Sequence, residues 1–171
     1  MNINPLLEFK VISKHRMISH YLPKLIQCLN SLSSELIWLK ESEDSNSIGG
    51  TVLHIQEHIH RNTKRMRDPS IRFNKGIENS FPSSYQNKVK LIEELENVFL
   101  KLGIEMDNLS GDQVNQYNIY HLVEHTAYHL GQIVDRTQRL TGIRFQFVQN
   151  GINESGLKEI IEEELRKKFG E

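Results

Sequence analysis

The sequence predicts an all-α protein, an antiparallel four-helix bundle with an additional C-terminal helix. Three observations support this fold class. Apolar residues recur at helical spacing along most of the chain, few segments alternate strictly between apolar and polar residues, and only four prolines and ten glycines interrupt the pattern. The 171 residues are expected to form a single domain, residues 1–171, because this length suits one domain with its own hydrophobic core.

The first predicted helix covers about residues 4–32, where leucine, valine and isoleucine recur at helical spacing. Pro23 is expected to kink this helix, because proline removes a helix hydrogen bond. Residues 33–46 are predicted to form a short turn and a linker that ends in ESEDSN. The second helix is expected to begin just after Ser47, which can cap free backbone N–H groups, and to end at Arg67 because Asp68-Pro69 follows.

The third helix is predicted after an irregular basic loop over residues 69–82. Ser83 or Ser84 is expected to cap this helix, which would end near Leu102 with Gly103 as its stop signal. Gly111 and Asp112 precede the fourth helix, which is expected over about residues 114–140 and is closed by Thr141-Gly142. The segment RFQFVQNGINE is predicted to be a loop, and a last charged helix covers about residues 155–169.

The composition is typical of a globular protein and excludes several functional classes. Hydrophobic residues make up 37% of the chain and charged residues 25%. The formal net charge of −1 argues against nucleic-acid binding, which usually needs a basic excess. Cys28 is the only cysteine, so no disulfide can form within the chain, as expected in a reducing compartment. Nothing around Cys28 would stabilise its thiolate, and we expect it to be a packed residue.

The N-terminal segment MNINPLLEFK lacks the basic region and apolar run of a signal peptide. No segment approaches the run of about 18 apolar residues that a membrane span needs. We therefore expect a cytoplasmic protein with no membrane partner.

Six of the eight histidines lie in two short windows, one in the second predicted helix and one in the fourth: His54, His58 and His60, and His121, His125 and His129. Residues four positions apart share one face of a helix, so His125 and His129 can direct two imidazoles toward one point. His54, on a facing helix, can add a third. Three imidazoles with an open position are typical of a catalytic divalent-metal site.

A helical wheel favours the same interpretation. In both helices the histidine row lies beside the apolar stripe, on the same side of it, so the two rows can meet at one end of a bundle. The alternative is that these are ordinary histidines, some exposed and some hydrogen-bonded. We favour the metal site because imidazoles seldom cluster without a reason.

Two other metal sites fit the sequence less well. HIQEH (54–58) and HLVEH (121–125) both match the HxxEH zinc-protease pattern, but those enzymes need a further acidic ligand and usually longer chains. A di-iron carboxylate site needs Glu-x-x-His on two helices. Glu57 and His60 supply one such pair, but the fourth helix has Ala127 where the second histidine should stand.

The segments NSIGGTVLHIQEH and YHLVEHTAYHLGQIV resemble the DinB-like superfamily of metal-binding four-helix bundles. In that family one histidine comes from the second helix, and an HxxxH pair followed by Gly-Gln-Ile comes from the fourth. The matching residues here are His54, then His125 and His129, then Gly131-Gln132-Ile133. The resemblance covers nearly the whole chain in order and spacing. Members of the mycothiol-dependent isomerase branch have an extra C-terminal domain, which this sequence does not include, so we expect the protein to lie outside that branch.

The resemblance implies a metal-dependent enzyme, most often a thiol transferase that joins bacillithiol, mycothiol or glutathione to a small electrophile. Zinc or nickel would be the metal, with iron as a further candidate, and a low-molecular-weight thiol would be the cosubstrate. A homodimer is expected from the family. Two alternatives stay open: a metal-dependent hydrolase, and a non-catalytic metal-binding stress-response protein.

Other residues near the predicted metal ligands are candidates for supporting roles. His58, one turn after His54, is predicted to act in the pocket as a fourth ligand or proton shuttle, and Gln132 is predicted to orient a ligand or substrate. Arg61 begins a basic run that would bind a carboxylate of an acidic thiol if it lay above the metal. The alternatives are a solvated polar surface and, for the basic run, favourable charge at a helix C-terminus. His121 and Tyr128 are weaker candidates.

Overall fold

The computed structural model describes residues 4–83 and 87–169, and within these ranges the chain is all-helical, with no strand. The predicted all-α class is therefore confirmed for the described part of the chain. Among these residues, no helix has both the length and the apolar character needed to cross a membrane.

The first long helical stretch consists of three consecutive segments: α1 (Pro5–His15), a π-helical segment (Arg16–Tyr21) and α2 (Leu22–Ser31). A kink is predicted at Pro23, and the feature that the structure has near this residue is a π-helical irregularity. The structure places it directly before this proline, where the Leu22 N–H donates to the Met17 carbonyl five residues back. Because Pro23 has no N–H to donate, the helix can change its hydrogen-bond spacing here at little further cost.

The second predicted helix is confirmed at both ends. A short helix, α3 (Ser34–Trp38), lies in the segment expected to be a turn and linker. It is followed by α4 (Ile48–Arg67). The Ser47 side chain accepts a hydrogen bond from the Gly50 N–H, and the helix ends at Arg67 as predicted, with Asp68 as its C-cap.

The third predicted helix, α5 (Lys88–Asn108), has different ends from those expected. Asn87 is its cap and accepts from the Val89 N–H, so Ser83 is not the cap, and Ser84 lies outside the described residues. The helix continues through Gly103, which is not a stop. A Cβ atom at Gly103 would lie 2.5 Å from Ile18 Cδ1, so this glycine allows α5 to approach the first helical stretch closely.

The last two helices agree with the prediction to within about two residues. The Asn115 side chain caps α6 (Gln116–Thr141), and Gly142, with φ of 73°, ends it in the left-handed conformation that glycine adopts readily. An extended connection leads to α7 (Glu154–Phe169). Short 3₁₀ turns occupy Ile77–Asn79 and Gly111–Gln113.

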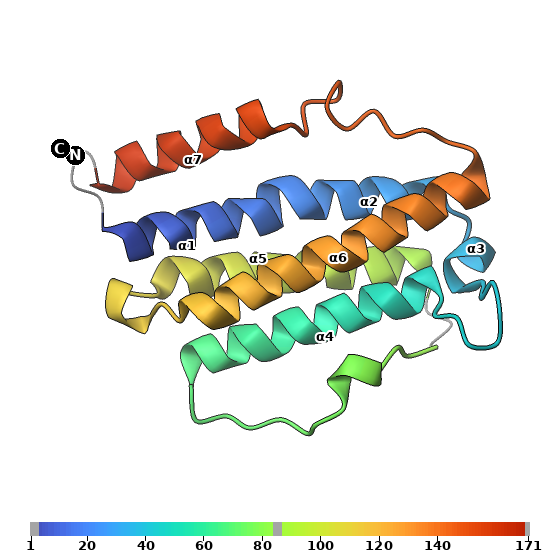
Figure 1. The fold of residues 1–171 in the computed structure, drawn as a ribbon, viewed down its shortest axis with the longest axis horizontal. Coiled ribbons are helices and arrows are strands. Elements are labelled where there is room, and N and C mark those ends of the chain that lie inside the picture. The colour runs from blue at the N-terminus through green and yellow to red at the C-terminus, as the bar shows by residue number, and fades with distance from the viewer. Residues whose placement is uncertain (1–3, 84–86, 170–171) are drawn as a thin grey trace.

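The long helices do not all alternate in direction. Figure 1 shows α1–α2 and α6 running one way and α4 and α5 the other. Two contacts along α4 agree, because the Gln56 amide near its middle donates to Leu91 near the start of α5, and Arg67 at its end pairs with Glu105 near the end of α5. The α4–α5 pair is therefore parallel and differs from the antiparallel arrangement expected. The described part of the connection, residues 68–83, runs back along α4 and makes this possible (Figure 1).

Buried apolar side chains fill the space between these helices, and the largest fully buried ones include Phe99, Met17, Leu25, Ile55 and Ile59. The helix α7 lies outside this group, alongside α1 (Figure 1). It buries Leu157 and Leu165 there.

Candidate metal centre

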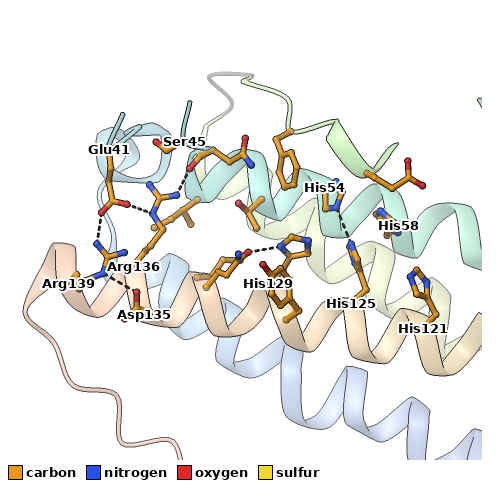
Figure 2. A pocket seen from close by; sticks show the side chains of 18 residues that line it. Glu41, Ser45, His54, His58, His121, His125, His129, Asp135, Arg136 and Arg139 are labelled. Atoms are coloured by element: carbon orange, nitrogen blue, oxygen red, sulfur yellow. Dashed lines mark hydrogen bonds and ion pairs between the residues drawn. The ribbon is translucent and has the colours of Figure 1, made fainter. Parts of the chain in front are cut away.

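Three histidines from two helices meet on the inner side of α4 and α6. His54 of α4 and His125 and His129 of α6 each offer a ring nitrogen, and these nitrogens lie within 4.8 Å of one another. Figure 2 shows the α6 histidines directed toward α4. His125 and His129 lie one turn apart on the same face of α6, so a single position on α4 can face both. The predicted grouping of these three residues is confirmed.

Hydrogen bonds orient two of the three imidazoles. His54 Nδ1 lies 3.0 Å from the Ser80 carbonyl oxygen, which can only accept, so His54 donates from Nδ1 and keeps a lone pair on Nε2. His129 Nδ1 lies 2.8 Å from Gln132 Oε1, which fixes its tautomer in the same way. Such bonds are typical of metal-bound histidines, because they direct the free nitrogen toward the ion.

The spacing of one nitrogen pair suits a small divalent ion. His54 Nε2 and His125 Nε2 are 3.1 Å apart. With a lone pair on His54 Nε2, this contact is attractive only if His125 donates a proton or a cation lies between the two atoms. Ligand bonds of about 2.0–2.1 Å in a tetrahedral zinc site place neighbouring nitrogens roughly 3.3 Å apart. His125 Nδ1 is buried without a hydrogen-bond partner, which leaves this ring free to adjust. The donor set therefore fits such a metal.

Burial keeps these histidines uncharged. Burial, together with the smaller effect of neighbouring histidines, lowers the pKa of His125 to about 3 and that of His58 to about 4. The pKa values of His54 and His129 are also lowered, again mainly by burial. Neutral imidazole is the form that binds metal ions.

The two residues predicted to act in catalysis both line the cavity beside the three histidines. His58 is 8% exposed, its ring stacks on His125 with 3.9 Å between centroids, and its buried Nε2 has no hydrogen-bond partner. Gln132 accepts from His129. These positions are compatible with the predicted roles, which stay predictions.

Arg61 does not lie above the histidines. Its Nε donates to Glu57 at 2.7 Å, its Nη1 donates to the Asn74 carbonyl at 2.8 Å, and its guanidinium lies 5.1 Å from the Phe73 ring. It is not among the cavity-lining residues, so it is not placed to contact a thiol bound to the metal, as was expected if it lay above the metal. Cys28 is fully buried, and burial raises its pKa to about 12, which agrees with a packed, unreactive thiol.

The cavity has a volume of about 680 Å³ and includes residues that the sequence analysis missed. Phe81 stacks on His54 with 4.2 Å between ring centroids, and no pattern in its loop indicates this. Arg136 and Arg139 line the other end with Glu41. The two arginines follow His129 by seven and ten residues, close to two and three helical turns, so helical periodicity could have placed them on the histidine side. His121 and Tyr128 also line the cavity.

A scan of the chain against models of protein families found no match, and searches of curated proteins and of solved structures found none either. The resemblance to the DinB-like superfamily therefore stays a prediction that rests on the motifs alone.

Proposed function

We propose that His54, His125 and His129 hold one divalent metal ion, with zinc or nickel as the first candidates and iron as the next. The observation that carries this proposal is the approach of three ring nitrogens to within 4.8 Å, two of them on rings oriented by hydrogen bonds. When bound, such an ion lowers the pKa of a water or thiol at its open position.

The reaction that we propose is transfer of a low-molecular-weight thiol to a small electrophile. The cavity beside the histidines, about 680 Å³, is in the size range of small-molecule sites. In this proposal the unpartnered Nε2 of His58 forms a hydrogen bond with the substrate. Gln132 accepts from His129 Nδ1 and so keeps the proton of this imidazole on Nδ1. The fold would be a four-helix bundle of the DinB-like kind, with α7 added on α1.

Metal content tests the first part of the proposal. We expect about one equivalent of metal in the untagged protein, by elemental analysis, and almost none in a His125→Ala/His129→Ala double variant. His60→Ala is the matched control, because His60 is an exposed histidine of α4 and should not affect the metal. If the untagged protein holds no metal and takes up neither zinc nor nickel, the proposal is wrong.

Thiol consumption tests the second part. With metal bound, we expect the protein to accelerate conjugation of a thiol such as glutathione or bacillithiol to monochlorobimane, and the double variant to lose this acceleration. Turnover of esters or amides without any thiol would favour the hydrolase instead. Bound metal with no turnover over broad substrate panels would favour a non-catalytic metal-binding protein.

A further inference from the structure

The cavity continues beyond the histidines to a pair of arginines on α6. Arg136 and Arg139 line its far end, and Glu41, from the segment that follows α3, lies across them (Figure 2). The proposed metal chemistry uses none of these three residues. Seven residues of helix separate His129 from Arg136, which is about 10 Å along the axis.

Glu41 bridges the two guanidinium groups with its carboxylate. Its Oε1 accepts from Arg139 Nη1 at 2.6 Å, and its Oε2 lies 3.2 Å from Arg136 Nε. The second contact is an ion pair without hydrogen-bond alignment, so Arg136 Nε stays buried and unsatisfied. A carboxylate thus already occupies this position, but it pairs imperfectly with one of the two arginines.

The two arginines have different remaining contacts. Arg136 is largely buried and donates to the carbonyls of Asn46 and Leu39. It therefore holds in place the segment of residues 39–46, part of which lines the cavity. Arg139 has a side chain that is 53% exposed and also pairs with Asp135, while its Nη2 has no partner among the described residues. Arg139 can therefore turn toward a ligand by exchanging its exposed ion pair with Glu41, while the hydrogen bonds of Arg136 to Asn46 and Leu39 still hold the segment in place.

We propose that this end of the cavity binds the carboxylate of an elongated organic acid, which takes the place of Glu41 on Arg136 and Arg139. Glu41 and Asp135 already balance the two positive charges, so an incoming carboxylate must exchange with Glu41 rather than add to it. Planar guanidinium groups favour carboxylates in paired geometry.

The proposed function sets the position of the other end of the ligand, and in that respect this inference rests on it. A group that binds the metal, such as a thiolate, would lie about 10 Å from the carboxylate. The chemical class is therefore a thiol that carries a carboxylate at this separation. A short mercapto acid cannot reach both positions at once.

The test measures binding of simple mercapto compounds to the zinc-loaded full-length protein by calorimetry. Mercaptooctanoic acid should bind at least about tenfold more tightly than mercaptooctanol, which has no carboxylate, and mercaptopropionic acid should lack this advantage. The single tryptophan, Trp38, stands three residues before Glu41. Its fluorescence should change with the long acid and not with the alcohol.

Three variants locate the effect. Arg139→Gln should remove the advantage of the acid over the alcohol, and Glu41→Gln should increase it several-fold, because no carboxylate then competes. Arg144→Gln is the matched control, an exposed arginine outside the cavity lining, and should leave it unchanged. Equal binding of acid and alcohol by the original protein would overturn the carboxylate site alone. Failure of both compounds, together with absence of zinc, would instead overturn the proposed metal function.

Discussion

At the scale of single residues, two hydrogen bonds determine which nitrogen atoms face one another in the histidine cluster. The Ser80 carbonyl fixes His54, and the Gln132 side chain fixes His129. The first partner is backbone, so no substitution of Ser80 removes it directly. The second is a side chain that the sequence analysis proposed as a ligand-orienting residue, and it can be tested by mutation.

Replacing Gln132 by alanine is expected to weaken zinc binding by about tenfold, since His129 loses the acceptor that fixes its tautomer. Competition with a chromophoric chelator measures this affinity. Gln132→Glu keeps an acceptor at the same position and should retain most of the affinity. Gln116→Ala, an exposed glutamine at the start of the same helix, is the control and should have no effect. Equal zinc affinity in Gln132→Ala and the original protein would show that this bond does not position the ligand.

The sequence could predict the three histidines but not the rest of the cavity. Spacing of four residues places His125 and His129 on one face, and the position of His54 beside its apolar stripe makes a meeting possible. Glu41 lies in an irregular segment, and its approach to Arg139 depends on the path of the chain after α3. Periodicity within one helix does not contain that information. For the same reason it could not show that Arg61 lies outside the cavity, where its position does not support the predicted contact with a metal-bound thiol.

At the scale of the helices, two glycines inside helices differ in the space around them. A Cβ atom at Gly49 would lie 2.5 Å from Cζ3 of Trp38, and two further ring atoms lie within 2.7 Å. A Cβ atom at Gly131, in the middle of α6, would meet nothing within 4 Å. The first glycine permits α3 to pack on α4, whereas the second has no packing function in the described chain.

Gly49→Ala is therefore expected to destabilise the protein by about 1–3 kcal/mol, because a rigid indole ring cannot yield to the added methyl group. Gly131→Ala should stabilise it by about 0.5–1 kcal/mol, since alanine restricts the unfolded chain without a clash. Thermal unfolding followed by circular dichroism measures both, at roughly 2–4 °C per kcal/mol for a chain of this length. A higher melting temperature for Gly49→Ala would show that the contact with Trp38 is not tight.

The helix whose two ends the sequence missed is α5, which starts after its cap Asn87 and continues through Gly103. Local signals placed both ends of α4 and the end of α6 correctly, because Ser47 and Gly142 act on their own backbone neighbours. The start of α6 lies after its cap Asn115, two residues later than predicted. Gly103 has the same local character as a stop signal, but it does not adopt the left-handed conformation that ends a helix, and α5 continues through it. The parallel course of α4 and α5 likewise follows from a long connection whose path has no periodic signal.

At the scale of the whole molecule, a network of charged residues attaches α7 to the rest of the protein. Glu164 of α7 accepts from Lys14 at 2.6 Å, lies 2.7 Å from His15 Nε2 and pairs with Lys168 at 2.8 Å. Its side chain is only 16% exposed. Burial alone would raise the pKa of this carboxyl, but the hydrogen bonds from Lys14 and Lys168 outweigh it and lower the pKa to about 2.

This shift predicts a pH-dependent contribution to stability. The folded-state pKa of Glu164 is lower than the usual value of 4.5, so its contribution is complete above about pH 5 and is lost as the pH falls toward 2. After allowance for solvent screening, we expect Glu164→Gln to cost about 1–2 kcal/mol at neutral pH. The loss should shrink steadily on acidification, because the native carboxyl then also becomes protonated. Urea unfolding at several pH values measures both quantities.

Glu159→Gln, an exposed glutamate of α7 that has no ion pair or hydrogen bond in the described chain, is the control and should have little effect at any pH. A loss for Glu164→Gln that is the same at acid and neutral pH would mean that the residue acts through packing, and that charge does not hold α7 on α1.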